Sequence, residues 1–150
     1  MTAPTLIIRP VTAAERAEWE PLWTGYLDFY QTKLPRETYD VTWERLQNPH
    51  EPMFVLGAYV NGALAGIVHY LYHRSCWTVG DYCYLQDLFV TESHRKLGLG
   101  RALIEAVYEA AKRDGASRVH WLTHETNATA RALYDTLADR PGFIQYRRIF

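Results

Sequence analysis

The sequence has few of the features that mark membrane, secreted or nucleic-acid-binding proteins. Among its 150 residues no apolar run approaches the roughly 20 residues of a membrane-spanning helix, and residues 1–10 contain no basic stretch followed by an apolar one. A formal net charge of -1 gives no electrostatic reason to expect a polyanion as the main partner. We therefore expect a cytoplasmic protein that binds neither membranes nor nucleic acids.

Cysteine is scarce, and its spacing fits no redox or metal motif. Cys76 and Cys83 are seven positions apart, which matches neither a CxxC pair nor a set of zinc ligands, and we interpret both as free thiols. His120 and His124 would share one face of a strand. However, no second histidine follows at HExxH spacing, and no carboxylate pair has ligand spacing. The sequence predicts no metal site.

Hydrophobic periodicity and turn residues divide the chain into alternating strands and helices, without repeats or linkers. Thr12 followed by Glu15 has the spacing of a capping box, and Pro21 is expected to kink or restart the helix that follows. Asn61-Gly62 predicts a tight hairpin between antiparallel strands. We expect strands at residues 5–9, 53–60, 63–73, 82–90, 118–124 and 143–150, and helices at residues 12–31, 39–46, 99–114 and 127–138. The order βααβββαβαβ implies one domain, residues 1–150, with a mixed sheet flanked by helices.

A glycine-containing turn precedes the third helix and is the most informative segment. Gly98 and Gly100 let the backbone approach a ligand closely, and the helix that begins near Leu99 directs unpaired N–H groups toward that ligand. A phosphate or pyrophosphate would fit there, with countercharge from neighbouring basic side chains. Those basic side chains are Arg95, Lys96 and Arg101. The alternative is a tight turn with a solvated basic face.

Two other phosphate motifs fail at this turn. A P-loop needs GxxxxGK followed by Ser or Thr, and a Rossmann turn needs a third glycine where Leu103 stands. The pattern Gln/Arg-x-x-Gly-x-Gly/Ala, by contrast, is satisfied at every fixed position by residues 95–100. A second block, Asn127-x-x-Ala130-x-x-Leu133-Tyr134 with Gly142-Phe143 further on, is similar to NxxAxxLYxxxGF with a longer stretch before Gly-Phe. Through these two blocks the chain resembles the GNAT superfamily of N-acetyltransferases.

The resemblance implies an α/β (α+β) fold with a mixed, mostly antiparallel sheet of about six to seven strands and about four helices. It also implies acetyl-CoA as co-substrate and direct attack by a primary amine in a ternary complex. The strand at residues 82–90 would splay from the next strand, and the pantetheine arm would lie between them. The implied cofactor-binding residues are Leu88, Phe89, Val90, Arg95, Lys96, Leu97, Gly98, Leu99, Gly100, Arg101, Asn127 and Tyr134.

The resemblance assigns Tyr134 to the departing coenzyme A sulfur, as a donor of a hydrogen bond or proton. The base that takes the proton of the amine is left open among Asp87, His94, His120, His124, Glu125 and water. In polyamine acetyltransferases, which the strand also resembles, a glutamate stands where this chain has Gln86, and Gln86 cannot act as a base. We therefore favour His124, Glu125 or an ordered water.

The sequence indicates the acceptor and the partners less directly than the cofactor. We expect a small primary amine, chosen by residues 20–48 and 72–82, and we leave a homodimer open. One alternative is a non-catalytic acyl-CoA-binding module that keeps the fold, and another is an acetyltransferase of protein lysines or N-termini. Tyr134 favours an enzyme over a pure binder. Aromatic side chains could line an amine pocket, although core packing explains most of them; they are Trp23, Tyr26, Tyr30, Trp43, Trp77 and Tyr82.

Overall fold

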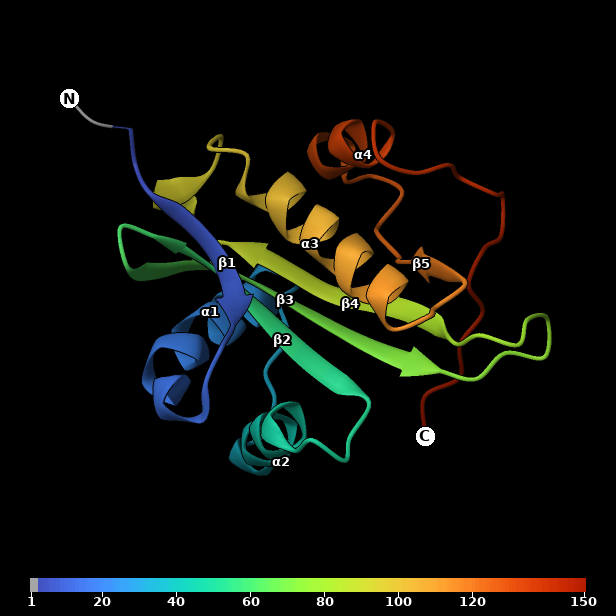
Figure 1. Ribbon diagram of the computed structural model, residues 1–150, viewed down its shortest axis with the longest axis horizontal. Helices are drawn as coiled ribbons and strands as arrows, with labels where there is room; N and C mark the ends of the chain where they lie inside the picture. Colours follow the sequence, from blue (N-terminus) through green and yellow to red (C-terminus); the bar gives the residue numbers. More distant parts are fainter. Residues whose placement is uncertain (1–2) are drawn as a thin grey trace.

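One five-stranded sheet organises the fold in the computed structural model, which describes residues 3–150 (Figure 1). The strands lie in chain order: β1 (Leu6–Pro10), β2 (Met53–Val60), β3 (Ala63–His73), β4 (Tyr82–Val90) and β5 (Arg118–His120). The first four pair antiparallel with their neighbours, and β4 pairs parallel with β5. This confirms a mixed, mostly antiparallel sheet.

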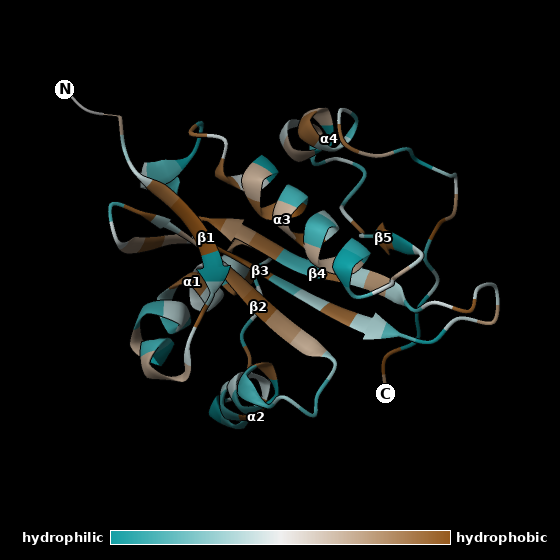
Figure 2. Ribbon diagram, viewed as in Figure 1, coloured by the Kyte–Doolittle hydropathy of each residue, from teal (hydrophilic) through white to brown (hydrophobic). Residues whose placement is uncertain are grey.

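Helices cover both faces of the sheet (Figure 1). On one face, α1 (Arg16–Phe29) and α2 (Arg36–Gln47) share an aromatic-rich core with β2 and β3. On the other face, α3 (Leu99–Arg113) packs its buried side chains, Leu103, Ile104 and Val107 among them, against Val68 of β3 and Leu85 of β4. Leu133 and Tyr134 of the short helix α4 (Ala128–Tyr134) pack against that second core. The helices contain both hydrophilic and hydrophobic residues, as expected for helices that are buried on one side (Figure 2).

The hairpin between β2 and β3 confirms the expected turn. Asn61 and Gly62 have φ values of 50° and 84°, the positive angles that a two-residue hairpin turn requires. The pairing Val60↔Ala63 directly flanks them.

The capping box at the start of the first helix is also confirmed. Glu15 accepts hydrogen bonds from the Thr12 backbone N–H at 3.0 Å and from Thr12 Oγ1 at 2.9 Å. The same carboxylate also accepts hydrogen bonds from Nη1 and Nη2 of Arg9 and from the Tyr59 hydroxyl. Because these donors favour the charged form, with the Arg9 bond the largest cause, the pKa of Glu15 is lowered to about 2. The box therefore joins β1 and β2 to the helix that follows.

Of the kink or restart expected at Pro21, the restart is wrong, and the kink stays a prediction. A single-turn 3-10 helix (Ala13–Glu15) leads into α1, and α1 then runs without a break through Pro21. Trp19 lies before the proline and Leu22 and Trp23 after it, and all three are at most 6% exposed in the same core. Burial on both sides of Pro21 outweighs the one backbone hydrogen bond that proline cannot make.

The C-terminal part of the chain departs most from expectation. β5 stops at His120 instead of residue 124, and α4 ends at Tyr134, four residues earlier than expected, with turns after it. Residues 143–150 form no strand, so the sheet has five strands instead of six to seven. The physical reason is that no described strand runs beside them, and a single strand without a ladder partner is not stable in water.

Across residues 3–150 the structure contains no helix that is both long and apolar enough to cross a bilayer.

The Glu15 cluster predicts an acid-dependent loss of stability. A carboxyl whose pKa is lower in the folded chain stabilises the fold above its unfolded value of 4.5, and this contribution is lost as the pH falls toward 2. Because solvent screens charges near the surface, the Glu15 charge contributes about 1–2 kcal/mol to the free energy of unfolding. Glu15→Gln should therefore be less stable than wild type at pH 7, and the gap should close below pH 4.5. Urea unfolding at several pH values measures it.

The matched control for Glu15 is Glu109→Gln on α3, where the side chain is 77% exposed. That variant should match wild type at every pH. A Glu15→Gln penalty that stays constant between pH 7 and pH 3 would contradict the role of the Glu15 charge.

Candidate active site

A bulge in β4 determines which side chains face which core. His69 lies opposite Asp87 and Tyr70 opposite Leu85, so Gln86 is an extra residue without a partner on β3. Strict alternation would place Leu85, Asp87 and Phe89 on one face. With the bulge, Leu85 packs under α3, whereas Phe89 packs against the α1 core and Asp87 hydrogen-bonds with His69 there.

The edge of β4 that faces β5 is open over most of its length. β5 pairs only with Tyr82–Tyr84, through Arg118, Val119 and His120. From residue 85 to 90, no described strand pairs with this edge. Alternate residues of a strand that pairs on one side direct their N–H and C=O groups to the other side, so part of this backbone is open to an extended ligand. Cofactor binding by Leu88, Phe89 and Val90 stays a prediction.

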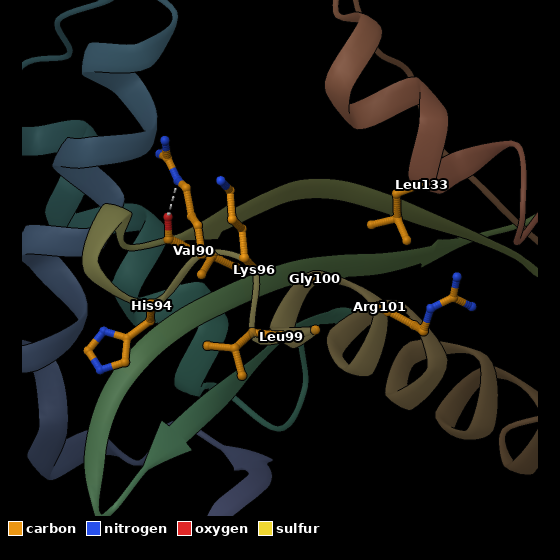
Figure 3. A pocket seen from close by; sticks show the side chains of 9 residues that line it. Val90, His94, Lys96, Leu99, Gly100, Arg101 and Leu133 are labelled. Carbon is orange, nitrogen blue, oxygen red and sulfur yellow. Dashed lines mark hydrogen bonds between the residues drawn. The ribbon is translucent and has the colours of Figure 1, made fainter. Parts of the chain in front are cut away.

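A pocket of about 260 Å³ lies where β4 ends and α3 begins (Figure 3). Gly98, the residue that caps α3, has a φ of 78°, which side chains disfavour, and the helix then directs its first N–H groups into the pocket region. An anion is stabilised at such a helix start. The lining residues are Val90, His94, Arg95, Lys96, Gly98, Leu99, Gly100, Arg101 and Leu133.

The basic side chains around the pocket are held differently. Arg95 Nε donates to the Val90 carbonyl at 3.3 Å (Figure 3). Arg101 donates to Thr136 Oγ1 at 2.8 Å and lies 3.7 Å from the Glu105 carboxylate. Within residues 3–150, neither Arg95 nor Lys96 forms an ion pair with an acidic side chain. The positively charged side chains of Arg95, Lys96 and Arg101 therefore lie around the N-terminal end of α3.

The pocket brings together seven of the residues that we expected to bind the cofactor: Val90, Arg95, Lys96, Gly98, Leu99, Gly100 and Arg101. The others lie elsewhere. Leu88 packs against the α3 core and Phe89 against the α1 core, while Leu97 is 51% exposed. Asn127 caps α4, with its side chain accepting from the Ala130 N–H at 3.5 Å, and Tyr134 lies at the other end of that helix.

Tyr134 and His124 belong to the segment that follows β5. Burial, followed by the neighbouring Tyr30, raises the pKa of Tyr134, whose ring packs edge-on against Trp121 with centroids 5.4 Å apart. The exposed His124 ring lies 5.7 Å from the Tyr30 ring. Glu125 is exposed, and its backbone carbonyl accepts a bond from Arg131. His124 therefore contacts Tyr30, whereas the ring contact of Tyr134 is with Trp121. Among residues 3–150 no ring contact or hydrogen bond joins Tyr134, His124 and the Glu125 side chain to one another.

The other candidate bases lie apart from one another. His94 lines the pocket, and its Nδ1 lies within hydrogen-bond distance of the Thr91 and Ser93 hydroxyls. His120 lies where β4 and β5 pair, stacked on Tyr84 with ring centroids 5.1 Å apart. Burial, followed by His73, lowers the pKa of His120, and this favours its neutral form.

A buried hydrogen-bonded chain under α1 was not predicted from the sequence. Trp19 Nε1 donates to His69 Nε2 at 3.0 Å, and His69 Nδ1 lies 3.0 Å from Asp87 Oδ2. An indole N–H can only donate, so Nε2 of His69 must accept and Nδ1 carries the proton that is donated to Asp87. Trp19 and His69 are 50 residues apart, and no local pattern links them.

Aromatic rings extend from this chain toward Tyr134. Trp23 stacks on Tyr26 at 5.2 Å between centroids, and Tyr26 contacts Tyr30 at 5.0 Å. Burial, followed by the charge of Asp87, raises the pKa of the Tyr26, Tyr30 and Tyr84 phenols. The expectation that core packing explains most of the aromatic set is confirmed for Trp23 and Trp43, whereas Trp77 is 74% exposed.

Both cysteines are free thiols, as we interpreted them. Cys83 is fully buried in the α3 core, and burial raises its pKa to about 12, which makes it inert as a nucleophile near neutral pH. Among residues 3–150, no group of three or more His, Cys, Asp or Glu side chains could hold a metal ion.

Comparison with known proteins gives a consistent result. The model of the acetyltransferase (GNAT) family matches residues 19–138. The D-amino-acid N-acetyltransferase HPA3 of Saccharomyces cerevisiae is 32% identical over 95% of this chain and 90% of its own length. The thialysine N-epsilon-acetyltransferase of Caenorhabditis elegans is 35% identical over 64% of this chain and 61% of its own length.

Solved structures share the fold at lower identity. An aminoglycoside N-acetyltransferase crystallised with CoA superposes with a TM-score of 0.78 and 17% identity, covering 99% of this chain and 94% of its own.

Proposed function

Since the chain belongs to the acetyltransferase (GNAT) family, we propose that it transfers the acetyl group of acetyl-CoA to a small primary amine. The observation that carries the proposal is the basic pocket at the start of α3, which adjoins the open edge of β4. In the reaction the amine nitrogen bonds to the thioester carbon, the carbon–sulfur bond breaks, coenzyme A leaves as a thiolate, and the amine loses a proton.

The pocket supports binding of the coenzyme A pyrophosphate. The unpaired N–H groups at the start of α3 and the side chains of Arg95, Lys96 and Arg101 supply donors and charge. A Cβ at Gly100 would meet only Leu133, at 3.5 Å, so the missing side chain leaves space on the pocket side of the helix. In this proposal Leu97 contributes through its backbone and Asn127 by starting α4.

The open edge supports binding of the pantetheine arm and the thioester. In this proposal the arm is held by those backbone groups of Leu88, Phe89 and Val90 that face the unpaired edge. An N–H donor at the thioester oxygen stabilises the oxyanion that forms as the amine attacks, an effect worth about 3 kcal/mol of barrier in comparable sites. No cysteine is needed for the step.

We propose Tyr134 as the donor to the sulfur and His124 as the group that passes the amine proton to water. The raised pKa of Tyr134 makes full proton transfer to a thiolate uphill, so the phenol acts as a hydrogen-bond donor. His124 is exposed to solvent and its ring lies beside Tyr30, and a histidine side chain can serve as a general base. Glu125, exposed next to His124, is the alternative acceptor, followed by an ordered water.

The acceptor is proposed to be a small molecule, because the chain's relatives are named for amino-acid acceptors. The net charge of -1 supports the same choice over a polyanionic or membrane-bound substrate. A cytoplasmic location stays a proposal on the same sequence grounds.

We also propose a homodimer formed through residues 143–150. Apolar side chains of this segment are 76–109% exposed in the single chain, and β5 is an edge strand on which a second copy's segment could pair. Light scattering should give twice the mass of one chain, and the mass of a single chain would contradict the proposal.

Replacing Gly100 tests the cofactor site. Gly100→Val should keep the fold, because its Cβ has only the ordinary contact with Leu133. The branched side chain should obstruct the pyrophosphate and weaken acetyl-CoA binding by at least about 10-fold in calorimetry. Glu109→Val, at an exposed position of the same helix, controls for the effect of a β-branched residue on α3. If folded Gly100→Val binds acetyl-CoA with unchanged affinity, the pyrophosphate does not bind in this pocket.

Replacing Tyr134 tests catalysis. Tyr134→Phe should lower kcat by roughly 10- to 1,000-fold, with acetyl-CoA affinity nearly unchanged, because it removes a donor needed only as sulfur charge develops. Tyr108→Phe is the matched control, because it also removes a phenol hydroxyl, one that donates to the Leu137 carbonyl. This variant should retain kcat within a factor of a few. If Tyr134→Phe keeps the wild-type kcat, the ring only packs against its neighbours.

A further inference from the structure

The helix α4, which ends at Tyr134, has little stability of its own. It is seven residues long, and isolated helices shorter than about 12 residues are marginal in water. Its N-terminal cap is weak, since the Asn127 side chain accepts from the Ala130 N–H at a long distance of 3.5 Å. Tyr134 is the last helical residue, and helix ends fray first. The position of its phenol therefore depends on what holds the C-terminal end of α4.

A chain of hydrogen bonds from α3 holds that end. The Thr136 hydroxyl donates to the Leu133 carbonyl at 2.7 Å, and Arg101 Nη2 donates to the same hydroxyl at 2.8 Å. Leu133 belongs to the last turn of α4, where carbonyl groups have no partner within a helix and where a nearby cation is favourable. Arg101 therefore caps α4 through Thr136, from 35 residues earlier in the sequence.

Arg101 also belongs to the pocket at the start of α3. Its side chain lines the pocket together with Leu133, which lies 3.5 Å from the place of a Cβ at Gly100 (Figure 3). The Glu105 carboxylate is 3.7 Å from Arg101, too far for a hydrogen bond. Since a guanidinium has five N–H donors in a rigid fork, Arg101 can bind an anion in the pocket and keep its bond to Thr136.

The bond to Thr136 has little to do with the stability of the whole domain. Thr136 is exposed, and substitutions at exposed positions usually change the free energy of unfolding little. What this bond can change is the local equilibrium between a closed and a frayed last turn of α4. Tyr134, two residues before Thr136, lies in that turn. An anion that holds the Arg101 side chain in place would favour the closed turn.

We propose that Thr136, held by Arg101, is a positioning residue that keeps the Tyr134 phenol directed at the coenzyme A sulfur while the pyrophosphate occupies the pocket. This inference rests on the proposed acetyl transfer and on Tyr134 as its donor. Thr136 itself touches neither the thioester nor the amine. It acts on the reaction only through the phenol.

The kinetics of Thr136→Val test the proposal, because valine has the shape of threonine without the hydroxyl. The variant should lower kcat about 2- to 10-fold, the effect of one net hydrogen bond. Because Arg101 keeps its charge at the pocket, the KM for acetyl-CoA should change less than kcat. Thr136→Ser keeps the hydroxyl and should restore the wild-type kcat. Thr126→Val, at an exposed position before α4, is the matched control and should keep both constants.

A double variant separates positioning from a general loss of structure. If Thr136 acts through the phenol, Thr136→Val should not lower kcat further in a Tyr134→Phe background. A structural role would instead lower kcat by the same factor in both backgrounds. Equal factors in the two backgrounds, or a wild-type kcat in Thr136→Val, would overturn the proposal.

Hydrogen exchange tests the same contact without catalysis. With CoA as the ligand, the amides of residues 128–138 should be about 2- to 10-fold less protected in Thr136→Val than in wild type or Thr136→Ser. If no amine is acetylated, or if Tyr134→Phe keeps the wild-type kcat, the proposed function fails, and this comparison still tests whether Arg101 and Thr136 hold α4. Equal protection in wild type and Thr136→Val would overturn the proposal.

Discussion

The bulge at Gln86 is the constraint on which the rest of the site depends. It adds one residue to β4 without a partner on β3, and from that point the side chains exchange faces. Leu85 stays in the α3 core, while Asp87 and Phe89 face α1. The same strand therefore has an unpaired backbone edge and holds a buried carboxylate on its α1 side. Without the bulge, Asp87 would point into the apolar core under α3, where its charge would be strongly unfavourable.

Two contacts hold α1 against this strand. The Trp19 indole reaches through the core to His69 at 3.0 Å, which fixes both the helix and the tautomer of the histidine. Phe89 packs so close to Gly25 that a Cβ there would come within 2.8 Å of its ring. Because Tyr26 and Tyr30 lie on the same helix, the position of the aromatic rings beside Asp87 depends on these two contacts.

The elements that depend on neighbouring residues could be predicted from the sequence. The capping box at Thr12, the Asn61-Gly62 hairpin and the start of α3 at Gly98 are all local. The bulge could not be predicted, because the alternation of residues 82–90 reads the same with or without an extra residue. The Trp19–His69–Asp87 chain joins three distant segments, and only the packed fold brings them together. Residues 143–150 have the composition of a strand but no strand beside them, and pairing needs a partner that composition does not reveal.

The proposed function requires that amine and acetyl-CoA are bound at the same time, so that the amine attacks the thioester directly. The fully buried Cys83 thiol, with a pKa of about 12, is not available for acetylation, and the other thiol, Cys76, is exposed but does not line the pocket. Initial rates measured over a matrix of acetyl-CoA and acceptor concentrations test this claim most directly. We expect double-reciprocal lines that intersect, as a ternary complex requires. Parallel lines, together with an acetylated enzyme trapped before amine is added, would contradict it.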